Sequence, residues 1–232
     1  MKKILISLLV ILTCSCSKQW AYGGKTGPDV WGELKDDFKF CKLGYNQSPI
    51  DIDGEFDKDD LKFSYSSAQV DKIAKNHVVQ VSFFNRDYVA RGRKKYFIRQ
   101  FHFHHPSEHL VKGQQTSLEM QVFHKSDDEQ WLVLAFFLKI GEENADFKQV
   151  VDLLESKQKD GEVDLSKMIK ARDKMFFYDG SLTTPPCTES VKWYVMKTPF
   201  EISKEQMNKI IKKGIFVPSN VRPVQEFHLD RY

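Results

Sequence analysis

The chain has 232 residues, of which 41% are hydrophobic and 13% aromatic, so its composition predicts a packed domain and excludes general disorder. The formal net charge is +3, and Lys2 and Lys3 supply two of these charges. Without them, 33 basic residues stand against 32 acidic residues, which gives no electrostatic reason to bind nucleic acid or an acidic membrane. We therefore expect no nucleic-acid partner.

Residues 1–16 have the pattern of an export signal. Lys2 and Lys3 precede an apolar run over residues 4–12, which is too short to span a bilayer as a mature helix. The end of this segment, residues 13–16, resembles a bacterial lipoprotein box with Cys16 as the lipidated residue. Simple cleavage and a short uncleaved anchor are the alternatives. We expect an exported protein of the periplasm or cell envelope, whose residues 17–232 form the domain and whose membrane contact is a lipid on Cys16.

The elements that follow are mostly strands. Segments rich in β-branched and aromatic residues predict strands over residues 78–84, 96–104, 118–124, 131–139 and 191–196. Apolar residues at helical spacing predict a helix over residues 145–156. A second helix should begin after a capping box at residues 203–206 and end at Gly214. The pattern predicts a mainly β (α+β) fold, a single antiparallel domain with short peripheral helices.

Two cysteines remain outside the proposed signal, Cys41 and Cys187. Exported proteins with two cysteines usually pair them, because their compartment is oxidising. The loop between them holds 145 residues, and closing it would stabilise the fold by roughly 4–5 kcal/mol in the chain-entropy view. Two free buried thiols are the alternative.

His102 and His104 are candidate metal ligands on one predicted strand. Residues i and i+2 of a strand point to the same face, with Cβ atoms roughly 6–7 Å apart. Two imidazoles at this separation can bind one ion at about 2.0–2.1 Å each. Phe101 and Phe103 alternate with them, so the opposite face belongs to the core. Spacing alone leaves open that these histidines face solvent or are satisfied by hydrogen bonds.

Several further segments carry a resemblance to a known family. They read WAYGGKTGPDVW from Trp20, CKLGYNQSPIDI from Cys41, QFHFHHPSEH from Gln100, LEMQVFH from Leu118 and YDGSLTTPPCTESVKWYVMK from Tyr178. In this order and spacing, over residues 20–223, the chain resembles the α-class carbonic anhydrases. The resemblance implies a large twisted, mostly antiparallel sheet with Zn²⁺ at the base of a conical cleft. It also implies reversible hydration of carbon dioxide to bicarbonate and a proton by a metal-bound hydroxide, in a monomer or dimer.

The resemblance assigns roles to individual residues. His102 and His104 correspond to the first two zinc ligands, and Gln100 to the group that accepts a hydrogen bond from His102. Thr183 corresponds to the threonine that orients the hydroxide, and Glu108 to the carboxylate that accepts the proton of that threonine.

Further matches concern the proton path, the substrate pocket and the cysteines. His77 aligns with the proton shuttle of the family. A histidine suits that task because its pKa is near 6.5. The alternative is that His77 is a plain exposed loop histidine. The residues matching the carbon dioxide pocket are Leu182, Val133, Trp193 and Thr184, with Phe123 beside them. His105, His109 and His124 are expected to be structural or surface residues. Cys41 and Cys187 fall where bacterial members carry their disulfide.

The pattern departs from the family at the third ligand, where Gln121 replaces a histidine within Glu119-Met120-Gln121. Its amide oxygen could still reach the ion, and Glu119 could accept from its amide group. Phe123 stands where a small apolar residue is usual. Both changes predict lower metal affinity or a lower rate. The alternatives are a weak or inactive carbonic-anhydrase-related surface binding protein, and another metal or another hydrolytic reaction, such as esterolysis, in the same cleft.

Overall fold

The structure is a computed structural model that describes residues 19–58, 61–75, 77–84, 86–156, 161–169, 174–214 and 219–228. The proposed signal and Cys16 lie outside these residues. Within the described ranges, no helix is long and apolar enough to cross a membrane.

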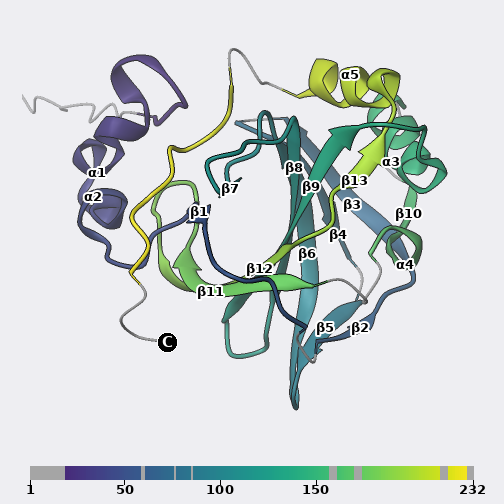
Figure 1. Ribbon diagram of the computed structural model, residues 1–232, viewed down its shortest axis with the longest axis horizontal. Helices are drawn as coiled ribbons and strands as arrows, with labels where there is room; N and C mark the ends of the chain where they lie inside the picture. Colours follow the sequence, from purple (N-terminus) through teal and green to yellow (C-terminus); the bar gives the residue numbers. More distant parts are fainter. Residues whose placement is uncertain are drawn as a thin grey trace, which may run out of the picture.

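One sheet of eleven strands dominates the molecule (Figure 1). Its main path runs β10–β3–β4–β6–β8–β9–β12–β11, while β13 pairs with β9, and β5 joins β6 to β2. These strands are β2 (Lys62–Ser64), β3 (Ser67–Lys75), β4 (Val79–Phe83), β5 (Tyr88–Arg91), β6 (Lys94–His104), β8 (Leu118–Lys125), β9 (Trp131–Ile140), β10 (Glu162–Asp164), β11 (Met175–Ser181), β12 (Glu189–Met196) and β13 (Phe200–Ile202). The predicted fold class is confirmed, and all five predicted strands are present.

The sheet is antiparallel except at β9, where β12 and β13 both pair in parallel. A separate parallel pair joins β1 (Asp51–Ile52) to β7 (Leu110–Val111). Parallel neighbours require a crossover in the chain, and here α3 (Ala145–Glu155), β10, α4 (Leu165–Met168) and β11 intervene between β9 and β12.

Short helices lie at the edges of the sheet. The α-helices are α1 (Trp31–Leu34), α2 (Phe40–Leu43), α3 (Ala145–Glu155), α4 (Leu165–Met168) and α5 (Lys204–Lys213). Three 3-10 turns cover Gly24–Thr26, Pro28–Val30 and Asp36–Phe38. The predicted capping box is confirmed, because the side chains of Ser203 and Gln206 each bond the other's backbone N–H at the start of α5. In Figure 1, α3 and α5 lie on the side of the sheet away from α1 and α2.

Alternation along the central strands divides the core between the two sheet faces. Phe101 and Phe103 of β6 pack in the cluster that includes residues of α3 and α5. The other face carries a second cluster built around β8, β9 and β12, with Phe123, Val133 and Trp193 among its members. His102 and His104 alternate with the phenylalanines, so they lie on this second face.

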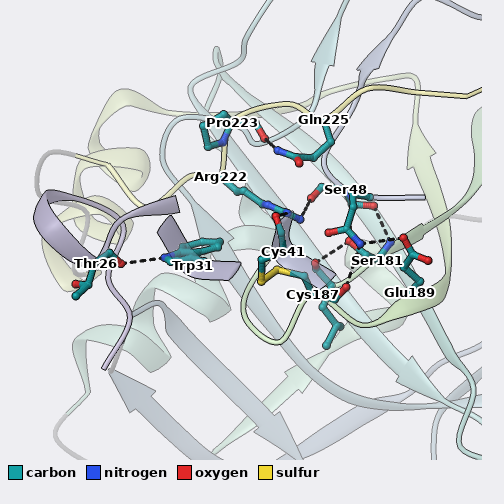
Figure 2. The surroundings of a disulfide bond; sticks show 12 residues. Thr26, Trp31, Cys41, Ser48, Ser181, Cys187, Glu189, Arg222, Pro223 and Gln225 are labelled. Atoms are coloured by element: carbon teal, nitrogen blue, oxygen red, sulfur yellow. Dashed lines mark hydrogen bonds between the residues drawn. A yellow bond between two sulfur atoms is a disulfide. The ribbon is translucent and has the colours of Figure 1, made fainter. Parts of the chain in front are cut away.

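A disulfide joins Cys41 in α2 to Cys187 in the segment between β11 and β12 (Figure 2). The predicted pairing is therefore present. Beside it, the buried Arg222 donates to the backbone oxygens of Ser48 at 2.7 Å and Cys41 at 3.0 Å. These contacts fasten the N-terminal segment to the segment that carries Thr183 and to the C-terminal part of the chain.

Candidate metal site and active-site cleft

The register between β6 and β8 brings the three predicted metal ligands together. His102 lies opposite Gln121, and His104 lies opposite Glu119. Because directly paired residues share a face, all four side chains point away from the Phe101 side. His102 is 7% exposed, and the other three side chains are wholly buried.

Each histidine is held in one tautomer by an acceptor behind its ring. Nδ1 of His102 lies 3.0 Å from Oε1 of Gln100, and Nδ1 of His104 lies 2.6 Å from the backbone oxygen of Asn220. Since both partners accept, each Nδ1 carries the proton and each Nε2 presents a lone pair. The two Nε2 atoms are 3.0 Å apart, so two lone pairs face each other. A cation between them would relieve this repulsion.

Gln121, directly opposite His102 on the neighbouring strand, brings an amide group to the same face of the sheet. Its amide nitrogen donates to Oε2 of Glu108 and to Oε1 of Glu119, both at 2.9 Å. Its Oε1 is buried, and no hydrogen-bond partner reaches it among the described residues. Burial and the neighbouring His104 lower the pKa of His102 well below its usual value, and the adjacent Gln121 side chain opposes this shift. The amide oxygen therefore lies beside the His102 ring.

Two neutral imidazole nitrogens and one amide oxygen fit a divalent metal ion. Within the described part of the chain, no three side chains of His, Cys, Asp or Glu gather as metal ligands. The donor set instead includes a glutamine. An unpartnered buried carbonyl oxygen is costly, and a metal ion would satisfy it.

The two carboxylates that hold Gln121 have their own partners. Glu119 accepts the backbone N–H groups of Glu108 and His109, and its Oε1 lies 2.8 Å from Nδ1 of His109. Burial raises the pKa of Glu119, but the neighbouring His109, with its hydrogen bonds, and secondarily His104 hold it at about 2. Oε1 of Glu108 accepts the backbone N–H of Arg222, and its Oε2 lies 3.3 Å from Nε2 of His104.

A cleft of about 320 Å³ leads to His102, and its lining includes His77, Phe123, Leu182, Thr183 and Thr184. The Phe123 ring stacks on the imidazole of His102, with centroids 5.1 Å apart and planes at 29°. The phenyl ring therefore covers part of His102, which is the one predicted metal ligand among the residues that line the cleft.

Val133 and Trp193 lie in the apolar cluster beside the cleft. Both are wholly buried in the apolar cluster of this sheet face, and neither lines the cleft. Val133 pairs with Phe123 across β8 and β9, and Trp193 lies 6.3 Å from the Phe123 ring. Phe123 belongs to the same cluster, and its phenyl ring lines the cleft.

His77 lies on the cleft lining and is half-buried. The Trp20 ring stacks on it with centroids 3.7 Å apart and planes at 27°. Burial lowers the pKa of His77 from its usual value. An imidazole that is neutral near pH 7 can accept a proton.

The remaining predicted positions are structural in their contacts. His109 is wholly buried, and its Nε2 lies 2.7 Å from the hydroxyl of Tyr178. His124 is also wholly buried, with its Nε2 2.7 Å from the hydroxyl of Tyr65. His105 contacts the backbone oxygen of Ser117 through Nδ1 at 2.7 Å.

Sequence reasoning missed Asn220, Arg222 and the contact between Gln121 and Glu108. Asn220 lies 116 residues from His104 and acts through its backbone, for which the sequence holds no signal. The expected hydrogen bond from Thr183 to Glu108 is not among those of the described residues; Glu108 accepts from Arg222 and Gln121 there.

Comparison with known proteins matches residues 26–229 to the eukaryotic-type carbonic anhydrase family. A carbonic anhydrase of Nostoc sp. is 36% identical over 219 residues, which cover 89% of this chain and 82% of the relative. One from Neisseria gonorrhoeae is 35% identical over 218 residues, with 89% and 84% coverage. The structure of the α-carbonic anhydrase of Thermovibrio ammonificans with the inhibitor sulfanilamide superposes with a TM-score of 0.80 and 35% identity, covering 91% of this chain and 96% of that one.

Proposed function

The chain belongs to the eukaryotic-type, or α-class, carbonic anhydrase family, and we propose that it catalyses the reversible hydration of carbon dioxide at a Zn²⁺ held by His102, His104 and Gln121. One observation carries the assignment of the ligands. Two imidazole lone pairs face each other at 3.0 Å, and the orphaned oxygen of Gln121 lies beside them. Gln100 and Asn220 keep the protons at Nδ1, so that both Nε2 atoms are free for the ion.

Zn²⁺ bound there would supply a water-derived nucleophile near neutral pH by lowering the pKa of a bound water. A neutral carbonyl oxygen is a weaker donor to zinc than an imidazole nitrogen. We therefore propose a lower metal affinity than a three-histidine site would have. These three side chains would hold the ion and leave it able to bind a water as well, as catalytic zinc sites require.

The chain's own groups shape the substrate side. Leu182 and Phe123 form an apolar surface in the cleft that suits carbon dioxide and excludes water, with Val133 and Trp193 packed behind. Thr183, on the cleft lining, would orient the reacting oxygen by a directed hydrogen bond. Phe123 narrows the approach to His102, which lowers the rate. His77 would accept the released proton and pass it to buffer.

We also propose that the protein is exported and held at the cell envelope by a lipid on Cys16, with residues 17–232 as the folded domain. The disulfide between Cys41 and Cys187 supports export, because such bonds persist in oxidising compartments.

A second function, a binding protein without catalysis, is favoured by two features of the site. Gln121 stands at the third ligand position, and the Phe123 ring covers His102. Under this alternative, the protein would fail to hydrate carbon dioxide even when zinc is supplied.

Stopped-flow measurement of carbon dioxide hydration decides between the two. Zinc-supplemented protein should show hydration above the uncatalysed rate, and the His102→Ala/His104→Ala variant should show none. Activity in neither protein, with zinc bound to the first, would overturn the proposed catalysis and leave the binding protein. Equal activity in both would mean that the reaction does not use these ligands.

A further inference from the structure

The amide group of Gln121 bridges two buried carboxylates. Its nitrogen donates one hydrogen to Glu108 and the other to Glu119, each at 2.9 Å, and all three side chains are nearly or wholly buried. Reversing the amide would point its oxygen at both carboxylates and its hydrogens at the imidazoles. The two carboxylates therefore fix the orientation of the amide, with its oxygen toward His102.

A histidine at this position would make fewer of these bonds. An imidazole that binds a metal through one nitrogen has a single N–H left to donate. Glu119 could accept that hydrogen, and Glu108 would receive none. The second N–H of the amide is thus a donor that glutamine adds to the site, and Glu108 accepts it.

Both carboxylate oxygens of Glu108 already accept a hydrogen bond. The backbone N–H of Arg222 donates to Oε1 and the amide of Gln121 donates to Oε2, which also lies 3.3 Å from Nε2 of His104. Thr183 is 2% exposed and lines the cleft, and among the described residues its hydroxyl makes no hydrogen bond to Glu108. Without a fixed acceptor, a hydroxyl can rotate and orients a partner poorly.

We propose that Gln121 donates to the Glu108 carboxylate in place of the Thr183 hydroxyl. Glutamine at this position then weakens the orienting role of Thr183 as well as the metal site. The inference rests on the proposed function, because it concerns the efficiency of the same reaction. Glu108 is then a positioning residue for Gln121. With a histidine at position 121, the Glu108 carboxylate would again accept a hydrogen bond from the Thr183 hydroxyl.

A double-mutant cycle between positions 121 and 183 tests this coupling through kcat/KM of the zinc-loaded enzymes. Thr183→Val should lower kcat/KM less than about fivefold in the native background and at least about 50-fold in the Gln121→His background. This tenfold difference corresponds to about 1.4 kcal/mol of coupling. Thr183→Ser, which keeps the hydroxyl, should recover most of the loss in both backgrounds. Equal losses in the two backgrounds would overturn the proposal.

A second readout needs neither metal nor activity. In metal-free, ¹⁵N-labelled protein, the side-chain amide signals of Gln121 are identified by their loss in Gln121→His. Both hydrogens should exchange slowly with water, and one should lose protection in Glu108→Gln. Fast exchange of both in the native protein would overturn the proposal even if the enzyme is active. If the Gln121 amide signals are protected but neither the native protein nor Gln121→His hydrates carbon dioxide, the proposed function would be overturned instead.

Discussion

The buried His124 makes the stability of the fold depend on pH. It is wholly buried on β8, and burial lowers its pKa from 6.5 to about 3. The unfolded chain binds a proton at this residue below about pH 6.5, whereas the folded chain stays neutral until about pH 3. Acid therefore favours the unfolded state, and stability from this residue is present above pH 6.5 and lost as the pH falls.

The size of the effect follows from the shift. Each pH unit between these two values changes the free energy of unfolding by about 1.36 kcal/mol. From pH 7 to pH 4 only the interval below 6.5 counts, so His124 alone should remove about 3 kcal/mol. This is a large part of the roughly 5–15 kcal/mol that stabilises a typical domain.

Urea denaturation at pH 7, 6, 5 and 4 measures this loss, with matched variants at the Tyr65–His124 contact. Tyr65→Phe removes the hydroxyl that lies 2.7 Å from His124 but keeps the histidine buried, so it should keep the pH dependence. His124→Leu combined with Tyr65→Phe should lose about 3 kcal/mol less than Tyr65→Phe alone between pH 7 and pH 4. If the free energy of unfolding fell equally with pH in these two variants, the reasoning would be refuted, because the two variants share all other titrating groups.

Three further predictions concern the site and the disulfide. Gln121→His should tighten zinc binding at least about 100-fold in a chelator competition assay, because losing groups that merely support ligands already costs about 10–100-fold; unchanged affinity would mean that Gln121 does not bind the ion. Phe123→Val should uncover His102 and raise kcat/KM for hydration, while costing about 2 kcal/mol in urea denaturation, less than the roughly 3–5 kcal/mol of a Phe→Ala change; an unchanged or lower kcat/KM would clear Phe123 of obstructing the pocket. Replacing Cys41 and Cys187 together by serine should lower the free energy of unfolding by about 4–5 kcal/mol, since the bond closes a loop of 146 residues in sequence separation; a loss below 1 kcal/mol would show that the unfolded chain is not constrained by it.

The strands and helix ends were predictable because their signals are local. β-branched and aromatic runs mark β4, β6, β8, β9 and β12, and the capping box marks the start of α5. The shared face of His102 and His104 followed from the period of two along β6. The parallel pairing of β9 with β12 was not predictable from such patterns, since it depends on a crossover through distant segments.

The site was predictable in its residues but not in its contacts. Gln121, Glu108 and Glu119 could be placed near one another, yet the amide's second bond to Glu108 depends on side-chain geometry. Asn220 contacts His104, and Arg222 contacts Glu108, through backbone atoms far along the chain, and the sequence holds no signal for such contacts. Phe123 could be placed beside the pocket, but its stacking on His102 depends on packing from neighbouring strands.

The zinc content of the protein tests the proposed function most directly. Protein purified without chelator and then given one equivalent of zinc should hold close to one zinc per chain after gel filtration, and His102→Ala/His104→Ala should hold none. Retention of about one zinc in the native protein alone is the result that the proposed His102, His104 and Gln121 site predicts. A native protein that retains no zinc, even with zinc in excess, would contradict it.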